Sequence, residues 1–188
     1  MIPEKKKVVL YKAIELFNQF GYTNVGIDLI IAESKVAKMT FYKYFPSKDL
    51  LITECLIERD LLIRDGITKA ISTVEQEPLK KLKAIFNWFN GWFKQDDFFG
   101  CMFIKALGQL HMNPSALNVA KSHKQWLIDQ INSILIDMNI INYDIALQIY
   151  LVLDGSIIRE QQFKDNLAIT YAWDMTLSII SASNEQRI

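Results

Sequence analysis

Apolar residues recur every three or four positions along most of the chain, which is the periodicity of an amphipathic α-helix. Near the N-terminus such a face is formed by Val9, Ala13, Leu16, Phe17 and Phe20, so we expect these five residues to be buried. No Val/Thr-rich run alternates as a strand would. The pattern predicts an all-α fold with helices over about residues 3–20, 27–33, 37–44, 48–73, 78–95, 102–111, 115–138, 143–162 and 165–182.

Residues 26–45 predict two short helices separated by a tight turn, and Pro46 follows them as a helix breaker. In the second short helix Ala37, Phe41 and Phe45 are spaced as one apolar row, which we expect to face the core. The opposite and flanking positions hold two lysines, two tyrosines, a threonine and Met39. Such an outward face suits a partner that is negatively charged and accepts hydrogen bonds, and a DNA groove is such a partner.

The charge distribution agrees with this interpretation, although the 188-residue chain has a formal net charge of zero. Residues 1–50 contain eight Lys, no Arg and five acidic residues, so they carry +3 and the remainder carries −3. A basic N-terminal part joined to an acidic remainder is typical of a DNA-binding domain followed by a separate sensing domain.

Two motifs resemble the DNA-binding segment of the tetracycline-repressor (TetR) family: Val36 to Tyr42, VAKMTFY, and Tyr44 to Leu50, YFPSKDL. Phe17 and the Phe20-Gly21-Tyr22 sequence match the end of the family's first helix. Lys35 departs from the family pattern, which usually has Gly in the turn between the two short helices. Further along, residues 100–104 and 153–157 resemble segments of one branch of TetR-like sensing domains.

The resemblance implies two domains, a TetR-type helix-turn-helix domain over residues 1–48, with the motif at 26–45, and an effector-binding and dimerisation domain over residues 49–188. It implies a sequence-specific transcriptional regulator, a repressor that a small, largely apolar effector releases from a near-palindromic DNA operator. It places Lys38, Thr40, Tyr42, Tyr44 and Lys48 at the duplex, and their chemistry suits phosphates. From the outward side we add Met39, whose side chain suits thymine methyl groups, and Lys43.

The second part of the chain is rich in large aromatic residues, which at helical spacing are usually core. The family places an effector cavity among these helices, and Trp is rarely fully buried without a partner for its N–H group. We therefore expect an effector pocket lined by Trp88, Phe89, Trp92, Phe93, Cys101, Phe103, Leu107, Trp126 and Gln148.

The helix from Tyr143 is apolar on almost every side, so one of its flanks needs to be covered by a second chain. The last helix offers a matching face. We expect a homodimer with a twofold four-helix interface, as the family uses. The predicted interface residues are Leu151, Gly155, Ile158, Ile169, Trp173, Leu177 and Ile180.

Other functions find little support in the sequence. Cys55 and Cys101 predict no disulfide framework and fit a reducing cytoplasm, and His111 and His123 lack the spacing of a metal site. Residues 5–7 are lysines followed by an amphipathic pattern, so no secretory leader is expected, and no run is long enough to span a membrane. We predict no catalytic residues, no metal and no cofactor. Two alternatives stay open, a helical interaction module without DNA binding and a helical enzyme.

Overall fold

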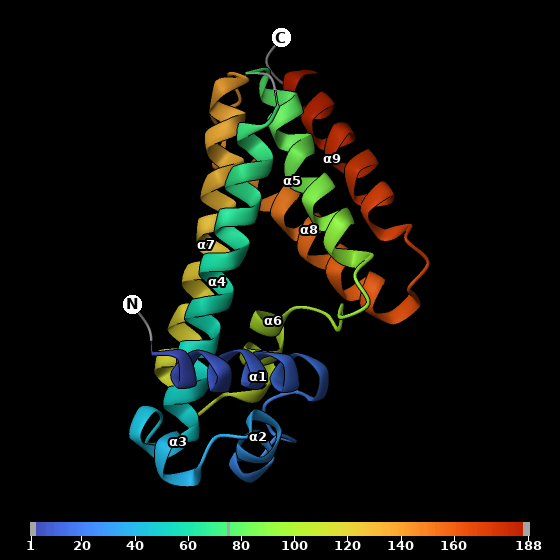
Figure 1. Cartoon of the computed structure of the whole chain (residues 1–188). Coiled ribbons are helices and arrows are strands. Elements are labelled where there is room, and N and C mark those ends of the chain that lie inside the picture. Colours follow the sequence, from blue (N-terminus) through green and yellow to red (C-terminus); the bar gives the residue numbers. More distant parts are fainter. Residues whose placement is uncertain (1–2, 75, 186–188) are drawn as a thin grey trace. The chain divides into compact units, whose positions relative to one another are not determined.

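The computed structural model describes residues 3–74 and 76–185, and these residues form nine α-helices joined by short turns (Figure 1). The predicted all-α fold, with an N-terminal helix-turn-helix followed by further helices, is confirmed. The helices are α1 (Glu4–Phe20), α2 (Ile27–Ser34), α3 (Lys38–Tyr44), α4 (Lys48–Ser72), α5 (Pro78–Phe93), α6 (Met102–Gln109), α7 (Pro114–Asp137), α8 (Tyr143–Phe163) and α9 (Ala168–Glu185).

The ends of the helices follow from local chemistry. Pro78 opens α5, where its missing N–H group costs nothing. The side chain of Asn142 accepts a hydrogen bond from the Asp144 N–H group at 3.0 Å and caps α8. The last helix begins at Ala168 rather than at Asp165 as the periodicity predicted, because the Asp165 carboxylate accepts the Leu167 N–H group at 3.0 Å in the preceding turn.

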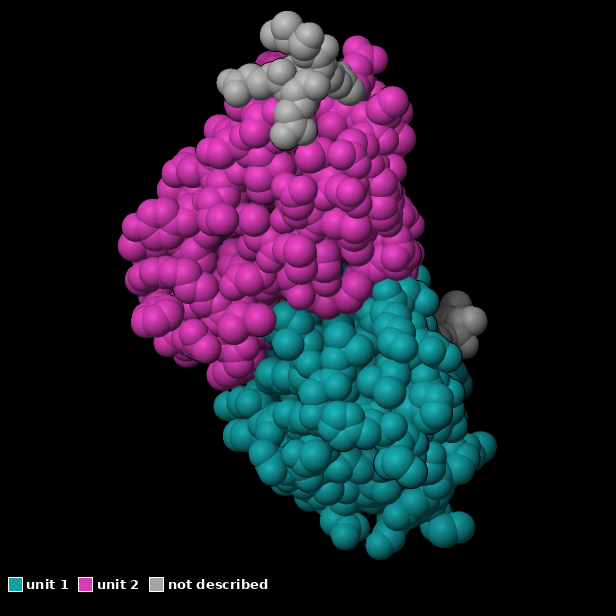
Figure 2. Space-filling model, turned by 180° about the vertical axis from the view of Figure 1, so that it is seen from behind, with its two compact units in different colours: residues 1–62, 101–123 teal, residues 63–100, 124–188 magenta. Residues whose placement is uncertain are grey.

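The chain forms two compact units, which Figure 2 colours separately. Unit 1 comprises residues 1–62 and 101–123, and unit 2 comprises residues 63–100 and 124–188. Both α4 and α7 therefore contribute to both units. The predicted division into domains of residues 1–48 and 49–188 is a different partition and stays a prediction.

Unit 1 has its core where α1 packs against α2 and α3. Val9, Ala13 and Phe17 are fully buried there, but Phe20 is 49% exposed, so its predicted burial is wrong. Cys55 of α4 is fully buried, and its thiol donates a hydrogen bond to the Leu10 carbonyl at 3.8 Å. Burial raises the pKa of this thiol well above its ordinary value.

Unit 2 is built around α5, α8 and α9, which pack against one another. Its core consists of apolar residues from all three helices, among them Leu82, Ile85, Phe86, Ile149, Leu153 and Ala172. Gly66 of α4 allows a close approach, because a Cβ atom at this position would lie 2.5 Å from Nε1 of Trp88.

Candidate nucleic-acid interface

The turn between α2 and α3 sets the angle at which α3 leaves the core. Lys35 in this turn has φ 54° and lies in the left-handed region, and its N–H group donates to the Ala32 carbonyl at 3.3 Å. The turn therefore requires the left-handed backbone conformation, in which glycine is the usual residue. In this conformation a lysine is less stable than a glycine by about 1 kcal/mol. Val36 follows and is buried, so it anchors the chain before α3 begins.

The inward side of α3 is held by two aromatic residues. Phe41 and Phe45 are fully buried, and their ring centroids are 5.9 Å apart. Ala37, which we expected in the same row, is exposed, because it caps the helix with extended backbone (ψ 140°) instead of occupying its first turn. The two buried rings thus hold the inward side of this seven-residue helix in the core.

The outward side of α3 is exposed and bears two of the predicted DNA-binding lysines. Met39 is 84% exposed and Tyr42 is 39% exposed, and Lys38 and Lys43 are exposed beside them. These four residues are called the α3 face below. Thr40 and Tyr44, also predicted to contact DNA, are half-buried on its flanks.

The lysine side chains of α3 form only weak interactions with the rest of the fold. Lys38 forms a long ion pair with Asp28 at 3.5 Å, in which both side chains are largely exposed, and such pairs contribute little to stability. The Lys43 ammonium lies 6.0 Å from the centre of the Tyr44 ring. Neither lysine is needed to hold α3 in place, so both are available to an anionic partner.

The start of α4 adds a third predicted cation. The Ser47 side chain accepts the Leu50 N–H group at 3.1 Å and caps the helix, as the sequence indicated. Lys48 is half-buried at this helix start, and burial lowers its pKa while Asp49 opposes that change. Lys6 of α1 pairs with Glu54 at 2.7 Å.

Residues 101–123 pack with the helix-turn-helix within unit 1, and the pattern of apolar residues did not predict this packing. The buried Tyr22 hydroxyl donates to the Met102 carbonyl at 3.0 Å, and the Tyr22 N–H group donates to Oε1 of Gln109 at 2.9 Å. Lys105 donates to the Asn18 carbonyl. These contacts connect α6 with the end of α1 and the turn that follows it within unit 1. The spacing of apolar residues along the sequence contains no signal for these contacts, which join residues 80 or 87 positions apart.

The nine residues predicted to line one effector pocket are divided between the two units. Cys101, Phe103 and Leu107 belong to unit 1, where the Phe103 ring stacks on His123 with centroids 3.8 Å apart. In unit 2, Trp88, Phe89, Trp92 and Phe93 form a chain of ring contacts. The other two residues of unit 2 do not join that chain of rings: Trp126 lies under Arg64, whose guanidinium is 4.9 Å from the ring centre, and Gln148 is exposed. A pocket formed by all nine stays a prediction.

The predicted dimer residues fall into two groups. Leu151, Gly155 and Ile158 of α8 are exposed, as an interface requires. On α9, Ile169 and Ile180 are buried, Leu177 is half-buried, and Trp173 packs on Phe86 with ring centroids 5.1 Å apart. The predicted α9 face is therefore covered within the chain, and the exposed apolar residues of this region are Leu167, just before α9, and Tyr171 and Met175 on it.

Leu151 and Gly155 line a groove of about 390 Å³ together with Tyr171 and Met175. This groove between α8 and α9 is called the α8–α9 groove below.

Metal and membrane sites find no support in the described part of the chain. Its His, Cys, Asp and Glu side chains form no group of three that could hold a metal ion. His123 is instead bound to Asp60, with Nδ1 and Oδ1 2.7 Å apart. Among residues 3–74 and 76–185, no helix is long and apolar enough to cross a membrane.

Residues 9–55, which contain α1, α2, α3 and the start of α4, match the family of bacterial regulatory proteins named tetR. Residues 9–55 of this chain are therefore similar in sequence to the TetR family. The match covers the helix-turn-helix described above, and the remainder of the chain is compared by its fold.

Sequence relatives share mainly this N-terminal segment. An uncharacterized HTH-type transcriptional regulator of Bacillus subtilis, YuxN, is 42% identical over 53 residues, which are 28% of this chain and 18% of that protein. An uncharacterized HTH-type transcriptional regulator of Lactococcus lactis is 25% identical over 114 residues, 60% of this chain and 56% of the relative. The chain thus matches less than two thirds of the length of these curated relatives.

Solved structures share the fold of almost the whole chain. A TetR-family transcriptional regulator from Streptomyces coelicolor has a TM-score of 0.88 at 22% identity, over 96% of this chain and 90% of that one. The reduced form of NemR from E. coli has a TM-score of 0.82 at 16% identity, over 94% and 98% of the two chains. The TetR fold therefore extends beyond the matched N-terminal segment.

Proposed function

We propose that the chain binds double-stranded DNA through the α3 face and regulates transcription. One observation carries this proposal: Phe41 and Phe45 are fully buried on the inward side of α3, while Lys38, Met39, Tyr42 and Lys43 are exposed on the outward side of a TetR-type helix-turn-helix. Lysines suit phosphates and guanine acceptors, and the Met39 side chain suits thymine methyl groups. Thr40, Tyr44 and Lys48 extend the contact along the backbone of the duplex.

The protein is proposed to act as a homodimer in the cytoplasm, where its operator lies. The α8–α9 groove supports this, because Leu151, Tyr171 and Met175 are more than half exposed there and a second copy would cover them. A twofold dimer places two α3 helices in successive major grooves about 34–36 Å apart, so the operator is near-palindromic.

A small, largely apolar effector is proposed to release the protein from DNA, which makes it a repressor. The row of rings from Trp88 to Phe93 in unit 2 supports an apolar ligand. A panel of hydrophobic compounds tested by tryptophan fluorescence and melting temperature checks this step. If no compound in a broad panel shifts either quantity, the effector proposal fails, while DNA binding stands or falls separately.

DNA binding is tested by a gel shift of the full-length chain on the DNA upstream of its own gene, with random duplex of equal length as control. We expect retardation of the specific fragment at nanomolar to micromolar protein, and affinity that falls steeply between 50 and 200 mM salt. Absence of retardation on both duplexes at low salt, with an intact dimer, would favour the alternative of an interaction module without DNA binding.

A further inference from the structure

Unit 2 contains a second pocket, with a volume of about 340 Å³, between the C-terminal end of α5 and the turn that joins α8 to α9. Three of its lining residues are buried: Phe93, Phe98 and Glu160 are 6%, 4% and 2% exposed. The remaining lining residues, among them Lys94, Asp96 and Lys164, are exposed. The pocket therefore has an apolar floor that contains one carboxylate, and a polar rim.

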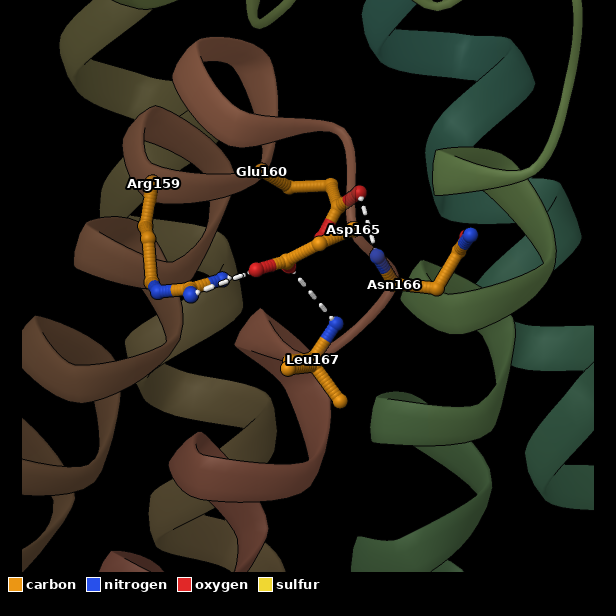
Figure 3. Close-up of polar contacts among 5 residues, drawn as sticks. All are labelled: Arg159, Glu160, Asp165, Asn166 and Leu167. Carbon is orange, nitrogen blue, oxygen red and sulfur yellow. Dashed lines mark hydrogen bonds and ion pairs between the residues drawn. The ribbon is translucent and has the colours of Figure 1, made fainter.

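The turn after α8 fixes the position of the Glu160 side chain. Lys164 and Asn166 have φ 51° and 60°, so the chain folds back on the end of α8. This brings the Asn166 N–H group to 3.0 Å from Oε1 of Glu160, as Figure 3 shows. The same carboxylate thus belongs to the end of α8 and to the wall of the pocket.

The second oxygen of this carboxylate is buried but unsatisfied. Oε2 of Glu160 has no hydrogen-bond partner among the described residues. The neighbouring cation Arg159 does not supply one, because its two terminal nitrogens bind the Asp165 carboxylate at 2.7 and 2.8 Å (Figure 3). Buried acceptors in folded proteins are nearly always paired, so an unpaired carboxylate oxygen in a pocket wall indicates a missing donor.

The aromatic rings beside Glu160 indicate which kind of molecule carries the missing hydrogen-bond donor. Phe93 and Phe98 have ring centroids 5.0 Å apart, and Phe98 is held edge-on against Trp92 at 5.0 Å. The faces of such rings attract cations as well as apolar groups. The volume exceeds the roughly 30 Å³ that one water molecule occupies in the liquid, so there is room for an organic molecule.

From these contacts we propose that the pocket binds a small molecule with a protonated amine attached to an apolar body. The ammonium group donates to Oε2 of Glu160, and the apolar body lies against Phe93 and Phe98. An anionic group at the same depth would face the carboxylate and is disfavoured. A regulatory role for this site rests on the proposed function. Binding of the amine itself is measured without DNA and is independent of that function.

The test uses the full-length chain and three probes with one phenyl ring: 2-phenylethylamine, its neutral analogue 2-phenylethanol, and the anion 3-phenylpropanoate. Isothermal titration calorimetry at pH 7 measures each affinity. We expect the amine to bind at least about tenfold more tightly than the alcohol, because its hydrogen bond to the carboxylate is charge-assisted. The anion is expected to bind weakest of the three.

Two variants separate the carboxylate from general effects. Glu160→Gln keeps an acceptor for the Asn166 N–H group but removes the charge, so we expect the amine to lose about tenfold in affinity and the alcohol to change little. Glu77→Gln is the matched control, since Glu77 is exposed at the start of α5 and does not line the pocket. It should leave all three affinities unchanged.

Several results would overturn the proposal. Equal affinities for the amine and the alcohol, or an amine affinity unchanged in Glu160→Gln, would remove the role of the carboxylate. No binding of any probe at 10 mM would mean that the pocket holds only water. If Glu160→Gln does not fold, the three-probe series on the wild-type chain decides the question alone. Because no DNA is present, none of these failures would affect the DNA-binding proposal.

Discussion

The α3 face and the α8–α9 groove are both exposed, but they have opposite chemistry. The α3 face carries Lys38 and Lys43, which water solvates well, beside the exposed side chains of Met39 and Tyr42. In the α8–α9 groove Leu151 is 66% exposed, and Tyr171 and Met175 are 53% and 55% exposed. The first surface is stable in water without a partner, whereas the second gains free energy when it is covered.

The two surfaces therefore differ in how reversibly we expect them to bind a partner. A charged surface can bind a duplex and leave it as the salt or effector concentration changes, because its side chains are well solvated in the unbound state. An apolar groove favours a partner that stays. We therefore expect dimerisation to persist under conditions that release DNA, and the following changes test this contrast in order of decreasing effect.

The largest effect is expected from a charge in the groove. Leu151→Glu should weaken self-association at least about 100-fold, because the dimer would bury an unpaired carboxylate. Sedimentation velocity over a range of concentrations measures it. Leu61→Glu changes a leucine that is also exposed, at 57%, but lies outside the groove, and should leave the dimer intact. Equal effects of both changes would refute the assignment of the groove as the interface.

The next largest effect is expected on DNA affinity. Lys38→Ala and Lys43→Ala should each weaken operator binding about tenfold and reduce the salt slope by about one, because each removes a phosphate contact. Melting temperatures should not change. Lys69→Ala removes a similarly exposed lysine from unit 2 and serves as the control. A loss of stability in the α3 variants would show that these lysines are structural.

A pair of tyrosines tests the contrast within unit 1 itself. Tyr22→Phe should destabilise the fold by about 1–2 kcal/mol, because the buried Met102 carbonyl loses its donor. Tyr42→Phe removes the same hydroxyl from the exposed α3 face, so we expect a change in DNA affinity without a change in stability. Chemical denaturation of both variants gives the comparison, and equal destabilisation would contradict it.

The smallest effect concerns Asp165, whose partner Arg159 lines the groove. The Arg159 guanidinium holds the pKa of the Asp165 carboxyl at about 2, below the value of about 3.9 of an unfolded chain. The ionised carboxylate therefore stabilises the fold above about pH 4, and this contribution is lost as the pH falls through about 2. The melting temperature of the wild type should exceed that of Asp165→Asn at pH 6 and approach it toward pH 2. A difference independent of pH would exclude this ion pair as the cause.

The order of the helices in the described residues and the outward residues of α3 could be predicted from the sequence, because both depend on local periodicity. What failed depends on contacts between distant residues. Phe20 has the spacing of a core residue yet is exposed, while Tyr22 is buried because its hydroxyl reaches the Met102 carbonyl. On α9 the helical pattern allowed two faces, and only the packing of Trp173 on Phe86 decides between them. The Glu160 pocket has no sequence signal, because it needs the turn at Lys164 and Asn166.

The buried thiols of unit 1 have a practical consequence for observing the molecule in motion. Cys55 is fully buried, so an alkylating reagent cannot reach its thiol in the native fold. Burial also raises the pKa of this thiol, so little of the reactive thiolate is present. Cys101 is 4% exposed and lies in the segment that packs on α1. Alkylation of either residue thus requires local opening of the fold. We expect the labelling rate of Cys101 to report detachment of residues 101–123, and that of Cys55 to report unfolding of the helix-turn-helix core. The two native cysteines therefore report these openings without any introduced label site.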